Sequence, residues 1–229
     1  DPYNRSGLPT EIGLDNCTHD NLKKIYSKYF SPRKAILSIA GNIPENILEM
    51  IKEFFGSWDG PLVEDLKFTD LSYKKFKHVQ EEAAQLQICY AFPAAKFGAE
   101  DYYVNKVATE VLSGGMFGRL FIEVREKRGL CYSVYAGHSS NNDFGQISVY
   151  AGTTPERAHE TLKVSIDTIK SISDNLDEIE LERAKANYLA SLILAEESVS
   201  GRAASNVMDY ILLKRIRPIT EFEEKINEN

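Results

Sequence analysis

Residues 114–135 read GGMFGRLFIEVREKRGLCYSVY, and this stretch predicts a loop, a helix, a stop and a strand in that order. Apolar side chains recur in it at the spacing of one helical face, so we expect the helix to begin near Phe117. Gly129 follows the last turn, where the left-handed conformation that ends many helices favours glycine. The strand after it is expected to carry four residues on one face: Leu130, Tyr132, Val134 and Ala136.

Arg125 and Tyr132 are the candidate functional residues of this stretch. At 100° per residue Arg125 lies at the border of the apolar stripe, and Tyr132 follows seven residues later on the strand. One interpretation is that the arginine lies along the core with its charged end in water, while the tyrosine packs inside the core. The other is that both polar ends meet at one cleft. The residues by themselves leave both interpretations open.

Charge spacing within the same stretch predicts ion pairs. Arg119 and Glu123 are four residues apart, as are Glu123 and Lys127, so we expect both pairs on the exposed side of the helix. Cys131 follows Lys127 and Arg128 closely, and such cations would lower the pKa of its thiol. A buried and inert strand thiol is the alternative.

The rest of the chain alternates between helical and strand-like patterns. Helices are expected over residues 18–30, 44–56, 101–113, 154–172, 177–197 and from 200 to about 228. Strands are expected over 35–40, 76–81, 84–92, 131–139 and 146–152, the last two joined by a turn at 141–145. The helix over 101–113 is expected to bury Tyr103, Val107, Val111 and Leu112. The helix over 154–172 is expected to bury Ala158, Leu162, Ile166 and Ile169.

The longer run GGMFGRLFIEVREKRGLCYSVYAGHSSNNDFGQISVYAGTTPERAHETL resembles the C-terminal homologous domain of the pitrilysin or insulinase-like zinc peptidases. The resemblance is greatest to the branch of the mitochondrial processing peptidase and its bacterial relatives. Four segments carry it: Gly118-Arg119-Leu120-Phe121, Arg125 to Val134, Asp143-Phe144-Gly145 and Ala151 to Glu156.

This resemblance implies an α+β fold, with a mixed or antiparallel sheet and helices packed mainly on one face. It also implies that residues 1–57 close a preceding homologous domain, that 58–74 form a linker, and that 75–229 form most of a second, metal-free domain. The chain is therefore expected to begin downstream of the family's metal site and to stop before the second domain is complete.

The same resemblance assigns roles to Arg125 and Tyr132. In the family, an arginine and a tyrosine of the second domain reach into the active site of the first, hold the substrate backbone and stabilise the tetrahedral intermediate. Donors at such a position are worth about 10²–10³ in rate. The implied function is part of a zinc-dependent endopeptidase: the non-metal half, which closes the substrate chamber.

The metal site of the family needs a His-x-x-Glu-His helix and a distant Glu, because two imidazoles one turn apart bind one zinc ion. No two of the four histidines here have that spacing: His19, His78, His138 and His159. We therefore expect no metal or cofactor in this chain, zinc in an N-terminal half, and no peptidase activity from this chain alone.

Composition limits the partners. The net charge of −7 argues against nucleic acid, and no segment predicts a membrane span or a signal peptide. The three cysteines are unclustered, which fits a reducing compartment such as the cytoplasm, or a fold that does not depend on disulfides. The expected partners are a peptide substrate and the metal domain, on the same chain or on a partner subunit.

Three alternatives are kept. The chain could be a non-catalytic partner or scaffold subunit of the same family, binding peptides or other subunits. A small-molecule α+β enzyme lacks support, since no phosphate-binding glycine loop, nucleophile elbow or CxxC is present. Finally, residues 18–57 could dock on 75–229, within one chain or between two chains of a homodimer.

Overall fold

The computed structural model describes residues 7–64, 76–80 and 82–227, and the chain divides into two compact units, Asp1–Gln80 and Glu81–Asn229. We call them unit 1 and unit 2. Most of the region over which a linker was expected, 58–74, lies outside the described residues from position 65 onward.

Unit 1 contains the helices α1 (Glu11–Asp15), α2 (His19–Tyr29) and α3 (Ile47–Phe55), and a 3-10 turn, η2 (Pro32–Lys34). Thr18, at the expected start of the helix, caps α2: its hydroxyl accepts a hydrogen bond from the Asn21 N–H at 3.3 Å. The strand predicted over 35–40 is wrong, because these residues pair with no other strand among those described. A strand needs a hydrogen-bonded neighbour, and alternation in sequence does not supply one.

The apolar faces of unit 1 are uncovered. On α2, Leu22, Ile25 and Tyr26 are all more than half exposed, and on α3 the same holds for Phe54. Each helix carries an apolar stripe, but neither α2 nor α3 has a buried residue. Isolated helices of this length are marginal in water, so these two need a covering surface to be stable.

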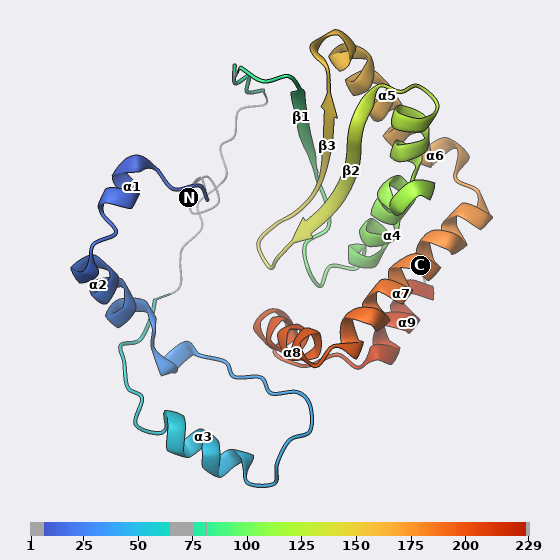
Figure 1. Ribbon diagram of the computed structural model, residues 1–229. Helices are drawn as coiled ribbons and strands as arrows, with labels where there is room; N and C mark the ends of the chain where they lie inside the picture. The colour runs from blue at the N-terminus through green and yellow to red at the C-terminus, as the bar shows by residue number, and fades with distance from the viewer. Residues whose placement is uncertain (1–6, 65–75, 81, 228–229) are drawn as a thin grey trace. The chain divides into compact units, whose positions relative to one another are not determined.

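Unit 2 is built on a three-stranded antiparallel sheet in the order β1-β3-β2 (Figure 1). The strands are β1 (Leu86–Pro93), β2 (Cys131–Ser140) and β3 (Gly145–Thr153), and β2 and β3 form the predicted hairpin. The strand predicted over 76–81 is wrong for its described part, since 76–80 form no strand.

One face of the sheet carries the core. Val134, Val149 and Ala151 point inward and pack with Leu120 and Val124, which are completely buried. In Figure 1, α4 (Tyr102–Ser113) and α5 (Ala158–Lys170) lie on this side of the sheet. The α+β architecture with helices packed mainly on one face is thereby confirmed, and the sheet is antiparallel rather than mixed.

The helices of unit 2 follow the predicted order with two corrections. The predicted buried face of α4 is confirmed at all four positions. On α5 the predicted face is confirmed only in part: its four residues are half-buried and Ile169 packs against the core, but the fully buried residues are Thr161, Ser165 and Thr168. Their hydroxyls donate to backbone carbonyl oxygens within the helix, for example Thr168 to Val164 at 2.8 Å. These polar side chains can therefore be buried without an unpaired group.

The second correction concerns the end of the chain. After α6 (Ile172–Asn175) and α7 (Glu178–Glu197), the predicted single last helix is two helices, α8 (Val199–Leu213) and α9 (Ile219–Asn227). Lys214 adopts the left-handed conformation (φ 59°) and ends α8. Phe222 and Ile226 of α9 are buried against α4 and α7 in a second core cluster, with Tyr103, Val107, Val111 and Ala184.

Candidate functional site

The helix that carries Arg125 begins later than predicted. A 3-10 turn, η3 (Gly115–Phe117), comes first, and Phe117 is 61% exposed rather than part of the apolar face. Gly118 then passes so close to the end of α4 that an added Cβ would lie 2.8 Å from the backbone of Leu112 and Ser113. Only glycine fits there, and the helix starts directly after it.

A π-helical turn, η4 (Phe121–Glu126), places Arg125 at the surface. The Lys127 N–H bonds to the Ile122 carbonyl oxygen five residues earlier, at 2.9 Å. This wider turn displaces the following side chains from the 100° spacing on which the sequence interpretation relied. Val124 stays fully buried, and Arg125 is exposed instead of lying at the border of the core.

A β-bulge places Tyr132 at the surface as well. Cys131 pairs with Thr153, but Ser133 already pairs with Gly152, so Tyr132 is the extra residue on its strand. The predicted alternation is therefore wrong at this point: Cys131 is buried, and Tyr132 is 74% exposed instead of sharing a face with Val134. Bulges often re-aim side chains beside functional sites.

The π-helical turn and the β-bulge bring Arg125 and Tyr132 together. The guanidinium carbon of Arg125 lies 5.7 Å from the ring centroid of Tyr132 and 5.0 Å from that of Phe121. Such contacts hold a guanidinium against aromatic faces and leave its N–H edges available. Within the described ranges, neither the Arg125 guanidinium nor the Tyr132 hydroxyl has a hydrogen-bond partner. Both polar ends are therefore free to bind a ligand.

The neighbouring thiol is not poised for nucleophilic chemistry. Burial raises the pKa of Cys131, and the positive charge of Arg125 only partly opposes this effect. Since the thiolate is the nucleophile, the buried and inert interpretation of Cys131 is favoured.

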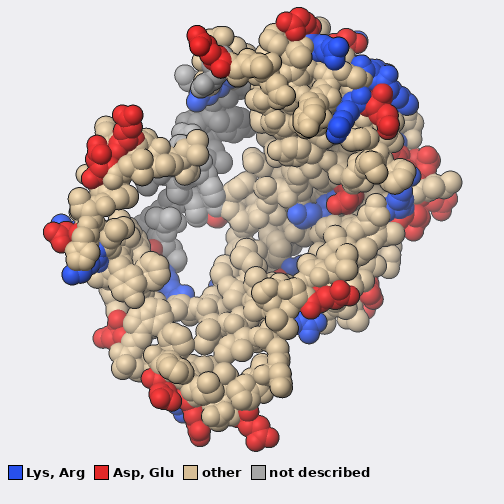
Figure 2. Space-filling view, viewed as in Figure 1, with Lys and Arg blue, Asp and Glu red and all other residues tan. Residues whose placement is uncertain are grey.

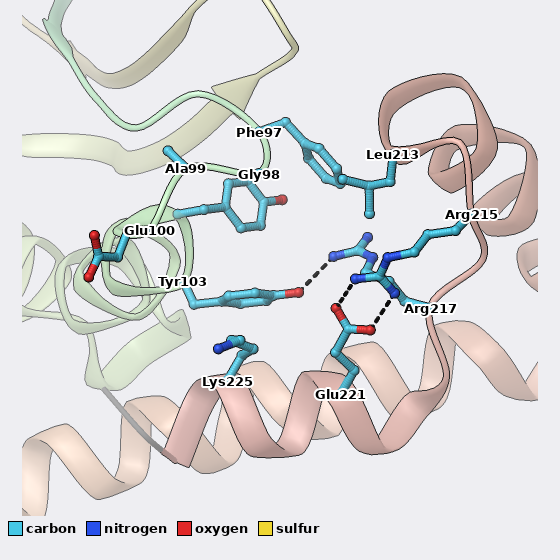
Figure 3. Close-up of a pocket in the computed structure, with 11 residues that line it drawn as sticks. Phe97, Gly98, Ala99, Glu100, Tyr103, Leu213, Arg215, Arg217, Glu221 and Lys225 are labelled. Atoms are coloured by element: carbon cyan, nitrogen blue, oxygen red, sulfur yellow. Dashed lines mark hydrogen bonds and ion pairs between the residues drawn. The ribbon is translucent and has the colours of Figure 1, made fainter.

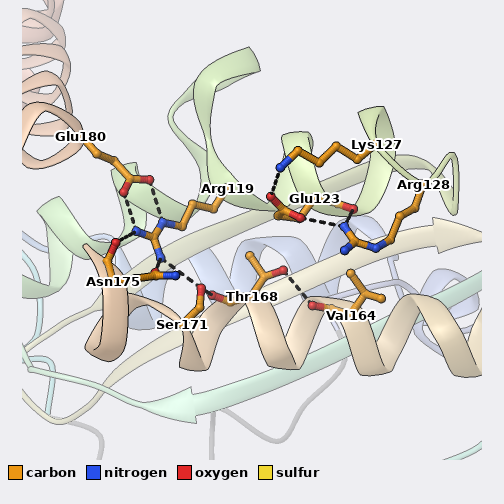
Figure 4. Close-up of polar contacts among 9 residues, drawn as sticks. All are labelled: Arg119, Glu123, Lys127, Arg128, Val164, Thr168, Ser171, Asn175 and Glu180. Atoms are coloured by element: carbon orange, nitrogen blue, oxygen red, sulfur yellow. Dashed lines mark hydrogen bonds and ion pairs between the residues drawn. The ribbon is translucent and has the colours of Figure 1, made fainter. Parts of the chain in front are cut away.

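A polar network fixes the start of the same helix (Figure 4). The predicted Arg119–Glu123 pair is wrong, because Arg119 binds Glu180 at the start of α7 at 2.7 and 2.5 Å. Its remaining N–H groups donate to Ser171 Oγ and to the side chain and carbonyl of Asn175. All five donors of the guanidinium are thus in use, and the hydrogen bond with Glu180 raises the pKa of Arg119.

The second predicted pair is confirmed. Lys127 Nζ lies 2.6 Å from Glu123 Oε1, and Arg128 adds a contact of 2.7 Å to Glu123 Oε2. Hydrogen bonds from Lys127 and then Arg128 lower the pKa of Glu123. These cations are therefore neutralised locally, unlike Arg125.

A buried cluster missed by the sequence analysis lies beside a pocket of about 430 Å³ between α4, α8 and α9 (Figure 3). Arg217 binds both carboxylate oxygens of Asp209, which is 2% exposed, and donates to the Tyr103 hydroxyl at 2.6 Å. Its guanidinium lies between the rings of Phe97 and Phe222, at 4.9 and 4.5 Å. The cluster fastens the α8–α9 turn to α4, and with Asp209 neutralising it, Arg217 is not available to an anionic ligand.

The residues described do not fit a zinc site. Across residues 7–64, 76–80 and 82–227, no three His, Cys, Asp or Glu side chains lie close enough to hold a metal ion. His138 makes a 2.8 Å hydrogen bond to the Ala95 carbonyl oxygen through Nε2. Searched over the same residues, no helix is both long and apolar enough to cross a membrane.

A family model described as the peptidase M16 inactive domain matches residues 16–188. The chain belongs to the M16 peptidase family. The motifs between Gly118 and Glu156 predicted the metal-free C-terminal domain of the pitrilysin or insulinase-like zinc peptidases. The match to the M16 inactive domain confirms that prediction.

The M16 domain has curated bacterial relatives. It is 32% identical over 228 residues to the uncharacterized zinc protease YmxG of Bacillus subtilis, covering 96% of this chain and 54% of that protein. It is 30% identical over 203 residues to the uncharacterized zinc protease SCO5738 of Streptomyces coelicolor, covering 84% and 44%. The chain thus spans about half the length of the relatives it matches.

Solved structures share the fold of the M16 domain. A peptidase M16 inactive domain from Pseudomonas fluorescens aligns with a TM-score of 0.77 at 22% identity, over 99% of this chain and 54% of that one. A protease from Helicobacter pylori aligns with a TM-score of 0.78 at 19% identity, over 96% and 55%. At these identities the likeness establishes the architecture alone.

Proposed function

We propose that this M16 domain is the non-metal half of a zinc-dependent endopeptidase, which closes the substrate chamber and contributes Arg125 and Tyr132 to peptide-bond hydrolysis. The observation that carries the proposal is the convergence of an exposed guanidinium and an exposed phenol, 5.7 Å apart, with no competing hydrogen bonds in the described part of the chain.

Arg125 is suited to hold a peptide carbonyl. Its guanidinium contacts Phe121 and Tyr132 through their ring faces, so the planar edge with its N–H groups stays available. Arg119 serves as the contrast within the same helix, because Glu180, Ser171 and Asn175 occupy its donors.

Tyr132 is suited to donate to an oxyanion. Its hydroxyl reaches solvent, and the bulge fixes the backbone beneath it, so little rearrangement is needed when charge develops. A donor placed where negative charge grows in the transition state is worth about 10²–10³ in turnover.

A partner half that holds the zinc completes the proposal, on the same chain or on another subunit. The described residues of this chain offer no metal site, while the relatives are named zinc proteases. The uncovered apolar faces of α2 and α3 support a partner as well, because exposed stripes of this kind mark interaction surfaces.

The test uses the peptidase assembled from this chain and the zinc-bearing half. Tyr132→Phe removes one hydroxyl and is expected to lower kcat by about 10²–10³ with little change in KM. Tyr210→Phe, on the exposed side of α8, is the matched control and should leave both constants unchanged.

Wild-type turnover in Tyr132→Phe would remove this residue from the mechanism. If Arg125→Leu also left turnover intact while peptides or subunits still bound, the chain would be a scaffold subunit, the alternative kept from the sequence. Arg125→Lys separates charge from geometry, since lysine cannot present a planar pair of donors.

A further inference from the structure

The strands of unit 2 contain no Lys, Arg, Asp or Glu, although 27% of the whole chain is charged. The strand register turns one set of residues away from the helices, and six of these define the outer face: Gln87, Cys89, Ser133, Tyr135, Ser148 and Tyr150. In Figure 2 the surface over the strands is tan, and the charged side chains of unit 2 gather over the helices. Surfaces depleted of charge and enriched in tyrosine are typical of the centres of binding sites.

Tyr135 and Tyr150 form a stacked pair in the middle of this face, which we call the tyrosine platform. The two residues pair across β2 and β3, and their ring centroids lie 4.9 Å apart at an interplanar angle of 29°. The Tyr150 hydroxyl donates to Gln87 Oε1 on β1, which anchors the lower ring of the stack. Tyr135 is 55% exposed, so the platform presents a fixed aromatic surface to a ligand.

A glycine leaves room on one side of the tyrosine platform. Gly152, two residues from Tyr150 on β3, faces outward, and an added Cβ would lie 3.1–3.3 Å from oxygens of Tyr150, Ser133 and Gln87. Gly137, two residues from Tyr135 on β2, has nothing within 4 Å of such a Cβ. The space over Gly152 is therefore filled by the Tyr150, Ser133 and Gln87 side chains, whereas the open surface at Gly137 lets a ligand lie beside Tyr135.

We propose that the tyrosine platform is a specificity subsite for an aromatic side chain of an extended peptide substrate. The inference rests on the proposed function, because continuity with Tyr132 along β2 is what brings a peptide there. Tyr135 is three residues beyond Tyr132, about 10 Å at about 3.3 Å per residue. An extended peptide held at Tyr132 would reach the platform with the side chain three residues from the bond that is cleaved.

An aromatic occupant fits better than a charged one. Aromatic rings pack in offset or edge-on arrangements on an exposed ring. An uncharged side chain also needs no charged partner on the strands. A cationic side chain could also lie over the rings, but the strands hold no carboxylate to compensate its charge.

The experiment compares kcat/KM of the assembled peptidase on peptides that differ only at the third residue on either side of the cleaved bond, where they carry Phe, Leu, Lys or Glu. Phe is expected to exceed Leu by about twofold to tenfold at one of the two positions. Tyr135→Ala should bring that ratio to about one by lowering kcat/KM on the Phe peptide more than on the Leu peptide, while Tyr135→Phe should keep the ratio. Tyr210→Ala is the control for removing an exposed tyrosine elsewhere in unit 2.

A Phe preference that survives Tyr135→Ala, or a Lys preference of equal size, would overturn the subsite. The two proposals can fail separately. If Tyr132→Phe is slow and Tyr135→Ala does not alter the ratio, only the subsite fails; if Tyr132→Phe is harmless and the ratio still depends on Tyr135, only the catalytic role fails. Added to this chain alone, the Phe peptide should shift the ring proton resonances of Tyr135 and Tyr150 more than the Leu peptide, and an absence of shifts would contradict the subsite.

Discussion

Replacing Asp209 by alanine should destabilise unit 2 by about 3–5 kcal/mol, the cost of leaving a buried ion without its partner. Asp209 is 2% exposed and the Arg217 side chain 11% exposed, so both charged groups are largely removed from solvent. Asp209 accepts two bonds of 3.1 Å and one of 2.5 Å from the guanidinium, and one of 2.9 Å from the Arg217 backbone N–H. After the substitution only Tyr103 and two aromatic rings would remain around Arg217.

Two further variants make this prediction specific. Asp209→Asn keeps the shape but removes the charge, and should cost about 1.5–3 kcal/mol, the range for hydrogen bonds to charged groups. Glu221→Gln alters the neighbouring Arg215–Glu221 pair, where two bonds of 2.6 Å join an arginine that is 54% exposed. Because solvent competes for that pair, its loss should lower the free energy of unfolding by clearly less than the loss of Asp209.

Urea unfolding followed by far-UV circular dichroism is the measurement. The single tryptophan, Trp58, lies in unit 1, so its fluorescence would not follow the loss of unit 2. At about 1–3 kcal/mol per molar urea, Asp209→Ala should lower the midpoint by about 1–5 M. Equal midpoint shifts for Asp209→Ala and Glu221→Gln would refute the reasoning. The buried Asp209–Arg217 pair would then contribute no more to the free energy of unfolding than the exposed Arg215–Glu221 pair.

Two other outcomes are expected. Arg119→Leu should destabilise unit 2 by about 3–5 kcal/mol in the same urea assay, because it leaves the Glu180 side chain, 13% exposed, without its cation; an unchanged midpoint would contradict a role for this network. Burial, together with Lys106 nearby, lowers the pKa of His138, while its hydrogen bond to Ala95 opposes this. The folded state therefore prefers the neutral ring, and stability should fall as pH decreases below about 6.5, the usual unfolded value. His138→Gln should flatten this dependence, and urea midpoints that fall equally in both proteins between pH 7.5 and 5.5 would exclude His138 as its source.

Local chemistry made much of unit 2 predictable. The face of α4 was identified at every buried position because its packing follows the simple helical period. The hairpin and the start of α7 beside its cap Asp177 were also located correctly, since turns and caps depend on neighbours in sequence. The family motifs around Arg125 and Tyr132 are also contiguous, so recognition needed no tertiary information.

The predictions failed where the backbone departs from a regular helix or strand, or where a side chain binds a residue distant in sequence. The period of 100° fails across the π-helical turn at Arg125, and the alternation of a strand fails across the bulge at Tyr132. Arg119 was expected to pair within its own helix, but its partner lies 61 residues away. Unit 1 shows the converse: its strand over 35–40 was predicted as if a partner strand were present.

The sequence by itself determined the family, the amphipathic helices, the hairpin and the identity of the two candidate residues, because each is written in side chains close together along the chain. Tertiary structure decided that Arg125 and Tyr132 reach solvent together, that Asp209 is buried against Arg217 and Tyr103, and that the outer face of the sheet carries a stacked tyrosine pair. The physical reason is that exposure and contact depend on which distant segments pack against a residue, and that packing is a property of the whole fold.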